Sequence, residues 1–405
     1  MESKTNNKEE NMKTNYFYII LSVIILMLSS CDDGLEYYNG VYINGAQGAD
    51  PIVTVALDQD LPKRVELVVA ASEIAKNDIV VELKVDESFV EKYNAKFQTK
   101  YTMLPAECYV LSHPVATITK GNFATTESVE LTLVSTEGMV EGRRYIVPVT
   151  IKATDGYGII DGSDVVYIKI DQQIVTSALN LGSRYINLNF HEENPNSQYN
   201  PRALPEVTFE ARVFINSLGQ FNTIFGLEEN LTVRVSTYGG ANGKIQIAGG
   251  GVEFASADAF PLEKWTHVAL SYNYTDKYLT LYVDGNPWIS GSFSRKAEHD
   301  KPLDLTQAYE GGWREGPMYI GRSAGGSRSL NGYVSEVRVW ARALSQAEVK
   351  SNMCAVDPTE PGLMGYWKLN DNKSVTTFEE SSGVGYTATL SSGSPSWIEG
   401  VKCPE

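Results

Sequence analysis

The chain is poor in the residues on which most metal and redox sites depend. It has four histidines and four cysteines among 405 residues, and no two histidines stand four positions apart as in a helical zinc pair. No cysteine spacing matches a zinc site or a redox pair. The composition therefore excludes the common histidine-based and thiol-based centres.

Basic residues are scarce as well. Lys and Arg number 34 against 50 Asp and Glu, which gives a formal net charge of −16. An acidic surface argues against nucleic acid and anionic membrane faces as partners, and it fits a neutral ligand. Apolar residues make up 42% of the chain, which excludes a disordered protein, and the length predicts two domains.

Only one long apolar run is present, and it lies near the start. Residues 16–28 (YFYIILSVIILML) follow Lys13 and precede the small residues Ser29 and Ser30. This layout is typical of a secretory signal. The alternative is a single transmembrane anchor, but the run is shorter than the roughly 20 residues that a spanning helix needs.

The end of this run resembles a bacterial lipobox. Leu28-Ser29-Ser30-Cys31 has the lipobox pattern, and Asp32-Asp33 after it resembles the surface-export signal of Bacteroidetes lipoproteins. The resemblance implies that residues 1–30 are a signal peptide and that Cys31 carries the lipid. It also implies an outer-membrane protein exposed on the cell surface, with the anchor as its only membrane contact. Residues 31–40 are then an acidic tether.

Residues 41–172 predict an all-β domain. Short runs of alternating apolar and polar residues are bounded by Asp, Gly, Pro and Asn, and one helix is expected over 87–97. The expected strands are 52–57, 64–70, 79–85, 128–134, 145–151 and 165–170. The pattern favours an immunoglobulin-like β-sandwich.

This first domain also resembles a known family. The succession VEKYNAKFQTKYTMLPAECYVLSHPVATITKGN, then VELTLVS and GRRYIVPVTI, resembles an N-terminal domain of unknown function that is common in Bacteroidetes lipoproteins. In that family it precedes lectin-like or glycosidase domains and has no known catalytic motif. The resemblance implies a spacer that holds the next domain away from the membrane.

Residues 173–405 predict a second all-β domain with one short helix, 345–353, which Ser345 and Glu348 would begin as a capping box. Three segments in order resemble the laminin-G-like branch of the concanavalin A-like jelly rolls. They are EKWTHVALSYNYTDKYLTLYVDGN (263–286), MYIGRSAGGSRSLNGYVSEVRVWARALSQAEVKSN (318–352) and GLMGYWKLNDN (362–372). The same jelly roll serves lectins, adhesion modules and glycan hydrolases, so the resemblance implies the fold more than the function.

The remaining cysteines suggest one disulfide. Cys354 and Cys403 bracket the last fifty residues, and an exported protein can keep them joined. Two free buried thiols are the alternative. Cys108 stands alone.

The tryptophans divide into framework and candidate ligand contacts. Those at 265, 340, 367 and 397 lie inside the framework motifs and are expected in the core, with His267 as a structural neighbour. Trp288 and Trp313 are outside it, and Trp313 stands in a Gly-rich loop with Tyr309 and Arg314. Aromatic rings stack on the C–H faces of sugars, while Arg donates hydrogen bonds to hydroxyls.

We therefore expect a glycan to contact Trp313, Arg314, Tyr309 and Trp288, with Tyr238 as a weaker candidate. The alternative for Trp313 is packing within its own loop.

Catalysis has little support in the sequence. Glycosidases of this fold usually place their acids on one strand as Glu-x-Asp-x-x-Glu, which is missing here. The adjacent pairs at 192–193, 228–229 and 379–380 are interpreted as solvated turn charges, because neighbours on a strand face opposite sides. We therefore expect a protein that is not an enzyme.

Calcium is the one cofactor to consider. Laminin-G-like domains often bind one Ca²⁺ through loop carboxylates, and the resemblance makes four aspartates candidate ligands. They are Asp276, Asp300, Asp304 and Asp371. None stands in an EF-hand order, which favours ordinary turn residues.

Together these features predict a cell-surface lipoprotein that binds an oligosaccharide without cleaving it. The resemblance places it beside an outer-membrane importer and glycosidases in a polysaccharide-utilisation system. One alternative is an adhesin or assembly module that binds protein. A glycoside hydrolase with unpatterned acids is the other.

Overall fold

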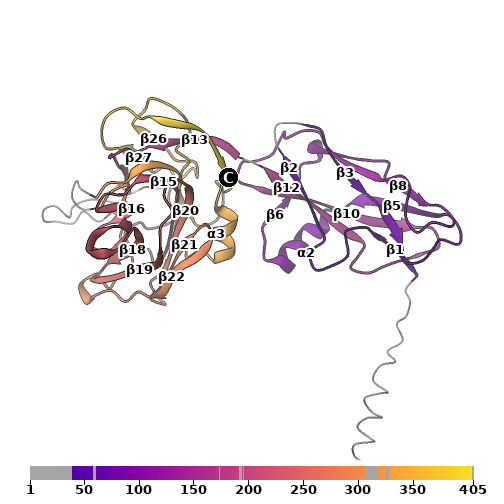
Figure 1. The fold of residues 1–405 in the computed structure, drawn as a ribbon, viewed down its shortest axis with the longest axis horizontal. Helices are drawn as coiled ribbons and strands as arrows, with labels where there is room; N and C mark the ends of the chain where they lie inside the picture. The colour runs from indigo at the N-terminus through magenta and orange to yellow at the C-terminus, as the bar shows by residue number, and fades with distance from the viewer. Residues whose placement is uncertain are drawn as a thin grey trace, which may run out of the picture.

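The computed structural model describes residues 39–403 except 58–60, 173, 191–193, 195, 307–317 and 324–327. The all-β prediction is confirmed, since the only α-helices among these residues are α2 (Ser88–Phe97) and α3 (Gln346–Asn352). Two β-domains lie side by side in an elongated molecule (Figure 1). No helix within the described ranges is long and apolar enough to cross a membrane.

The first domain is built from three sheets around one apolar core. Their strand orders are β11-β1-β4, β2-β12-β10-β5-β8 with β6 beside β10, and β3-β9-β7. The strands are β1 (Gly40–Ile43), β2 (Ile52–Leu57), β3 (Lys63–Leu67), β4 (Val69–Ala71), β5 (Ile79–Val85), β6 (Tyr101–Met103), β7 (Tyr109–Ser112), β8 (Val115–Ile118), β9 (Val129–Leu133), β10 (Arg144–Thr154), β11 (Gly158–Ile159) and β12 (Val165–Gln172).

Most of the expected elements of this domain are present. The predicted strands 52–57 and 79–85 coincide with β2 and β5, and the predicted helix coincides with α2 to within one residue. The single strand expected over 64–70 is wrong, because the chain changes sheets at Val68. Up to Leu67 it pairs with β9 in one sheet, and from Val69 it pairs with β1 in another.

The second domain is a sandwich of two large sheets, here called the front sheet and the back sheet. The front sheet has the order β19-β18-β17-β16-β23-β14-β27-β26, and the back sheet has the order β22-β21-β20-β15-β24-β13-β28 with β25 beside β24.

The front strands are β14 (Ile186–Leu188), β16 (Phe221–Leu227), β17 (Leu231–Ser236), β18 (Lys244–Gly249), β19 (Val252–Ala259), β23 (Tyr319–Ile320), β26 (Thr377–Glu379) and β27 (Thr387–Leu390). The back strands are β13 (Ile174–Asn180), β15 (Glu206–Ser217), β20 (Trp265–Asn273), β21 (Tyr278–Val283), β22 (Asn286–Ser292), β24 (Asn331–Trp340), β25 (Leu363–Trp367) and β28 (Trp397–Cys403).

Residues of β24 alternate between the two faces of the back sheet. Val337 and Val339 face the core between the two sheets, where they pack with residues such as Val233 of the front sheet. Arg338 and Trp340 lie on the opposite face of the back sheet and are also fully buried. Something must therefore cover the outer face of that sheet.

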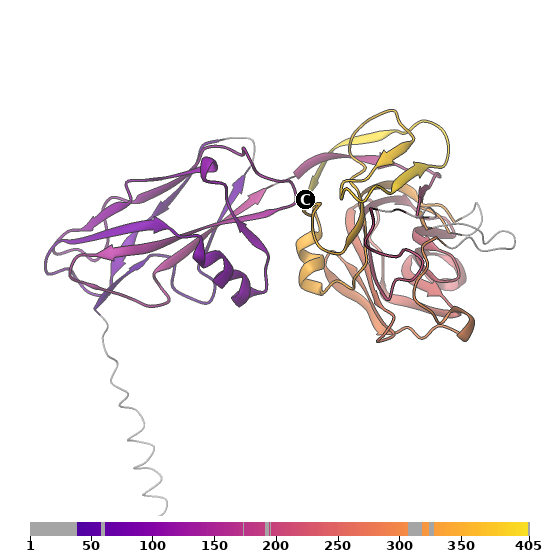
Figure 2. The same ribbon diagram turned by 180° about the vertical axis from the view of Figure 1, so that it is seen from behind.

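Helix α3 and the segment after it provide this cover. Ser345 begins α3 with the predicted capping box, in which Glu348 completes the reciprocal bonds. Val349 of the helix, with Leu344 and Val356, packs on Trp340 in an apolar cluster over the back sheet. Figure 2 shows α3 on the side of the second domain that faces the first.

Charged side chains are sealed beneath this cover. Glu210 of β15 is fully buried and accepts a hydrogen bond of 2.6 Å from Trp340 Nε1. His267 Nε2 and Arg338 Nη1 lie 3.4 and 3.6 Å from its carboxylate oxygens. Burial acts to raise the pKa of Glu210, but His267 and the charge of Arg338 outweigh it and hold that pKa below its ordinary value.

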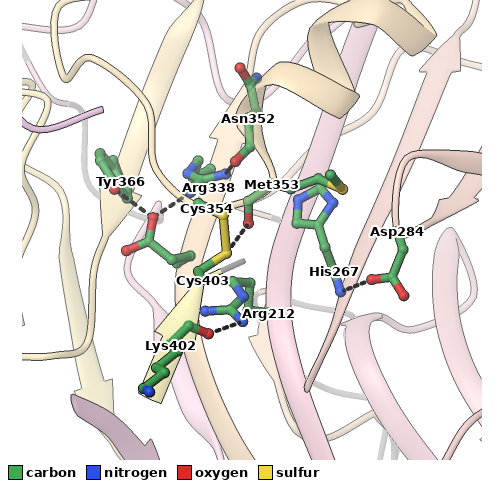
Figure 3. The surroundings of a disulfide bond; sticks show 11 residues. Arg212, His267, Asp284, Arg338, Asn352, Met353, Cys354, Tyr366, Lys402 and Cys403 are labelled. Atoms are coloured by element: carbon green, nitrogen blue, oxygen red, sulfur yellow. Dashed lines mark hydrogen bonds and ion pairs between the residues drawn. A yellow bond between two sulfur atoms is a disulfide. The ribbon is translucent and has the colours of Figure 1, made fainter. Parts of the chain in front are cut away.

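Arg338 connects this layer to the cover. It forms an ion pair with Glu336, which also accepts a 2.6 Å hydrogen bond from the Tyr366 hydroxyl (Figure 3). Its Nη1 donates to the carbonyl oxygen of Asn352 at the end of α3, at 2.6 Å. The carboxylates of Glu210 and Glu336 thus fix the position of the Arg338 guanidinium, and the guanidinium in turn binds the end of α3.

The disulfide lies at the rim of the same region. It joins Cys354 to Cys403, the two cysteines that the sequence analysis paired, and so ties the end of α3 to strand β28 (Figure 3). Arg212 donates a 3.1 Å hydrogen bond to the carbonyl oxygen of Lys402 beside it. Cys108 is free and buried in the first domain.

The covering segment also forms the contact between the domains. Arg143 of the first domain donates to Asp357 at 2.7 Å from Nε and 2.5 Å from Nη2. At Gly142 the two backbones nearly touch, because a Cβ there would lie 2.2 Å from the carbonyl group of Val356. Other pairs across the contact are Lys100–Glu360, Arg144–Ser351 and Lys368–Glu141.

Replacing Glu210 by Gln tests the buried layer. Loss of the carboxylate leaves Arg338 short of a partner in the interior, which should lower the free energy of unfolding at pH 7 by about 3–5 kcal/mol. A folded-state pKa below the ordinary value means that this stabilisation is complete at higher pH and is lost as pH falls. The difference between wild type and Glu210→Gln should therefore shrink from about pH 4.5 downward.

Urea denaturation at a series of pH values measures this difference. Glu127→Gln, which alters an exposed carboxylate of the first domain, is the control and should change little at any pH. An equal loss for Glu210→Gln at pH 7 and at pH 3 would show that the charge of Glu210 is unimportant.

The disulfide gives a second test. It closes a loop of 49 residues, so replacing Cys354 and Cys403 by Ser should lower the free energy of unfolding by about 2–4 kcal/mol. A reductant should lower the thermal midpoint of the wild type and leave that of the double variant unchanged. Equal responses of both proteins to the reductant would contradict the prediction.

Candidate functional site

The outer face of the front sheet is the open face of the second domain. Along β17, Val233 and Val235 point into the core, so Thr232 and Arg234 point outward. α3 and its neighbours cover the back sheet on the side of the first domain, and Figure 1 places the front sheet on the far side. A ligand that needs a broad polar surface therefore meets the front face.

Two tyrosines and an arginine form a platform on this face. Tyr319 of β23 and Tyr185, just before β14, lie on paired strands, with ring centroids 5.2 Å apart and planes at 85°. The guanidinium carbon of Arg322 lies 4.4 Å from the Tyr185 ring centroid and 5.4 Å from that of Tyr319. All three side chains are half-buried. We call this group the tyrosine platform.

A glycine brings Arg322 to this position. A Cβ at Gly226 of β16 would lie 1.8 Å from the carbonyl oxygen of Arg322, so any larger residue would push the segment away. Gly226 pairs directly with Tyr319 across the β16–β23 ladder. The close approach of the two backbones thus sets the platform on the sheet.

A charged hollow of about 360 Å³ lies on the same sheet. Arg234 Nη2 forms an ion pair of 2.8 Å with Glu253, and Arg328 Nη1 forms one of 2.9 Å with Glu228. Gln246 Nε2 lies 3.3 Å from the second oxygen of Glu253. Burial lowers the pKa of Arg234 below its ordinary value, although the charge of Glu253 opposes the shift. We call this group the charged hollow.

Phe221 connects the charged hollow to one of the predicted residues. Its ring lies under the guanidinium carbons of Arg234 and Arg328, at 4.5 and 5.2 Å from the centroid. The Tyr238 ring packs against it at 5.3 Å and is 60% exposed. Tyr238, the weakest ligand candidate from the sequence, is therefore an exposed ring on the open face.

The other predicted contacts lie elsewhere or outside the described residues. Trp313, Arg314 and Tyr309 fall in the range 307–317, which is outside them. Trp288 lies on β22 at the edge of the back sheet, where it packs against the hydrophobic core and makes an edge contact of 6.4 Å with Phe260.

Sequence reasoning missed the platform and the hollow. Glu228 was interpreted as a solvated turn charge, whereas it is largely buried in its pair with Arg328. Residues 319–322 were interpreted only as part of the segment that resembles the laminin-G-like family. The signal that could have found it is the position of Tyr319, which faces outward because Ile320 must face the core.

The same stretch contains a pattern that the interpretation of the sequence wrongly took to be absent. Gly321-Arg322-Ser323-Ala324-Gly325 has the Gly-x-Ser-x-Gly pattern of a nucleophile elbow. Ser323 is only 1% exposed, and its hydroxyl lies 3.2 Å from that of Thr223. It follows a strand of the front sheet and cannot meet a substrate, so the match is not an elbow.

Three of the four candidate calcium ligands are engaged separately. Asp300 forms an ion pair with Lys277, Asp304 accepts hydrogen bonds from Thr306, and Asp371 lies 3.7 Å from a lysine. No group of three or more His, Cys, Asp or Glu side chains suited to a metal ion occurs in the part of the chain that the structure describes.

A second cleft, of about 340 Å³, lies between the domains. Three of the four cations that line it are matched to carboxylates, since Arg143 pairs with Asp357, Arg342 with Glu348 and Lys100 with Glu360. Arg144 instead donates to the hydroxyls of Ser351 and Tyr101. Charges that satisfy one another across two domains are typical of an interface. The front face is the better candidate for a ligand.

Comparison with known proteins agrees with the two-domain architecture. A model of the concanavalin A-like lectin and glucanase superfamily matches residues 185–350, and a model of an N-terminal domain matches residues 37–158. No curated protein matches the chain.

Solved structures of other proteins share this fold. The fold is similar to that of a candidate carbohydrate-binding protein from Bacteroides ovatus ATCC 8483, with a TM-score of 0.62 and 24% identity over 89% of this chain and 97% of that one. A weaker likeness is to Bacteroides thetaiotamicron EndoBT-3987 with Man5GlcNAc product, with a TM-score of 0.29 and 16% identity over 33% of this chain and 30% of that one. Another is to a SAP-like pentraxin of Limulus polyphemus, with a TM-score of 0.34 and 13% identity over 53% of this chain and 94% of that one. Residues 37–158 are thus similar to a recognised family of N-terminal domains, and residues 185–350 are similar to the concanavalin A-like, laminin-G-type jelly rolls.

Proposed function

We propose that this protein binds a glycan on the front face of its jelly roll and does not cleave it. The observation that carries the proposal is the tyrosine platform beside the charged hollow. Aromatic rings accept the apolar C–H face of a sugar, and the guanidinium groups of Arg322, Arg234 and Arg328 donate hydrogen bonds to its oxygens. A few polar groups on an apolar support is the usual composition of such a site.

The arrangement of the carboxylates supports binding over hydrolysis. Glycosidases use two carboxyl groups roughly 5–10 Å apart, both in contact with the substrate. Glu228 and Glu253 of the hollow are each held by an arginine. Another close set of acids, Glu210 and Glu336, is sealed under α3 at 0% and 3% exposure. Neither set is arranged as an acid and its partner.

The Bacteroides ovatus structure fits the same proposal, since it is described as a candidate carbohydrate-binding protein and its likeness extends over both domains. We further propose that Cys31 anchors the chain to the outer membrane at the cell surface. There the first domain would act as a spacer, and the glycan would pass to an importer and glycosidases of one polysaccharide-utilisation system. The ion pairs between the domains would keep the front face directed away from the anchor.

A glycan array of the fragment from Asp32 onward tests the proposal. Tyr319→Ala should weaken binding to the best oligosaccharide by roughly tenfold, because it removes a stacking contact of about 1.5 kcal/mol. Tyr278→Ala, which removes a half-exposed ring from the back sheet, is the matched control and should leave binding unchanged. Trp313→Ala tests the remaining sequence prediction, and EDTA tests the proposal that calcium takes part.

Three outcomes would contradict the proposal. An absence of binding to plant, host and microbial glycans would favour a protein-binding module. Equal losses for Tyr319→Ala and Tyr278→Ala would place the ligand elsewhere. Release of shorter products from a bound oligosaccharide would show an enzyme.

A further inference from the structure

We infer that the front face selects acidic glycans, in which a sugar carboxylate sits on Arg322. This inference rests on the proposed function and adds the class of the ligand. It differs from the neutral ligand that the net charge of the chain favours. The reason is the state of Arg322, which has no acidic partner among the described residues, whereas Arg234 and Arg328 do.

Arg322 differs from the neighbouring arginine on the same side of the domain. Arg184 donates to the carbonyl oxygens of Leu181 and Asn180 at 3.1 and 2.7 Å, so its guanidinium is committed to the backbone. Arg322 makes no such hydrogen bonds to described residues, and its buried Nε has no partner there. A buried donor without a partner costs stability and is seldom kept without a reason.

The platform holds this guanidinium ready for a planar anion. Cation–π contact with Tyr185 and Tyr319 fixes its plane against the two rings, and Gly226 fixes the backbone below it. A guanidinium presents two parallel N–H donors that match a carboxylate, and a group fixed in advance loses little rotamer entropy on binding.

The charged hollow completes the site for a longer glycan. Tyr319 pairs with Gly226, and Gly226 pairs with Thr232, so the hollow begins two strands away, or about 10 Å across the sheet. Its two arginines are outnumbered by three carboxylates, Glu228, Glu229 and Glu253, which suits the hydroxyls of a neighbouring sugar better than a second carboxylate. We therefore expect the front face to have one binding position for an acidic sugar unit and one for a neutral sugar unit.

Paired ligands test this inference directly. Oligogalacturonides and sialylated oligosaccharides are compared with their carboxyl-reduced and desialylated counterparts by calorimetry on the fragment from Asp32 onward. We expect at least tenfold tighter binding of one acidic glycan than of its neutral counterpart. Arg322→Gln should remove that preference and change the affinity for the neutral glycan less than twofold.

Two further variants keep the test selective. Arg322→Lys keeps the positive charge but lacks the two parallel N–H donors of a guanidinium. It should retain only part of the preference for the acidic glycan. Arg202→Gln removes one exposed positive charge from the same domain and should have no effect, which separates local contact from net charge. Thermal midpoints of all the variants show whether each one is folded.

The outcomes separate this inference from the proposed function. Binding of neutral glycans that Tyr319→Ala weakens, without an acidic preference, would keep the proposed function and overturn the inference. An acidic preference that survives Arg322→Gln would also overturn it. No binding of either member of any pair would overturn both.

Discussion

The ion pair between Glu210 and Arg338 is the interaction on which the rest of the architecture depends. It places charge on the outer face of the back sheet, where a jelly roll of this kind could otherwise meet solvent. Because Arg338 also reaches the carbonyl oxygen of Asn352, it holds α3 and the following segment over that face. This cover then carries Val356 and Asp357 into contact with the first domain. One buried layer thereby organises the helix, the disulfide and the contact between the domains.

The cover decides which face remains for a ligand. With the back sheet buried against α3, the front sheet lies on the side away from the first domain (Figure 1) and presents half-buried side chains such as Arg234 and Tyr319 there. Those side chains include the tyrosine platform and the charged hollow, which strands from distant parts of the chain bring together. This arrangement fits the proposal of a tethered binding protein with a spacer domain on one side and a ligand-binding face on the other.

The sequence predicted the local structure well because local chemistry dictates it. Ser345 and Glu348 fix the start of α3 through three-residue spacing, and Val337 and Val339 face the core through strand alternation. Asp284 and Gly285 have the positive φ angles that an Asp-Gly pair favours in a tight hairpin turn. Where the chain changes sheets at Val68, no local signal marks the change, and the prediction failed.

The site was harder to predict than the fold, for a physical reason. Tyr185 and Tyr319 are separated by more than 130 residues and meet only because β14 pairs with β23 in one register. Register is set by the whole sandwich and cannot be read from either segment. Aromatic residues in Gly-rich loops were therefore easier to notice than rings on a sheet, and of those candidates only Tyr238 is placed on the open face.

Hydrogen exchange measured with and without a bound oligosaccharide tests the central claim most directly, because it maps the ligand onto one face. If the oligosaccharide binds the front sheet, backbone amide exchange should become slower in residues 185–188, 221–236 and 318–323. It should not change in residues 340–360, which include α3 and the segment after it. Protection of 98–102 and 340–360 instead would place the ligand in the cleft between the domains and contradict the account.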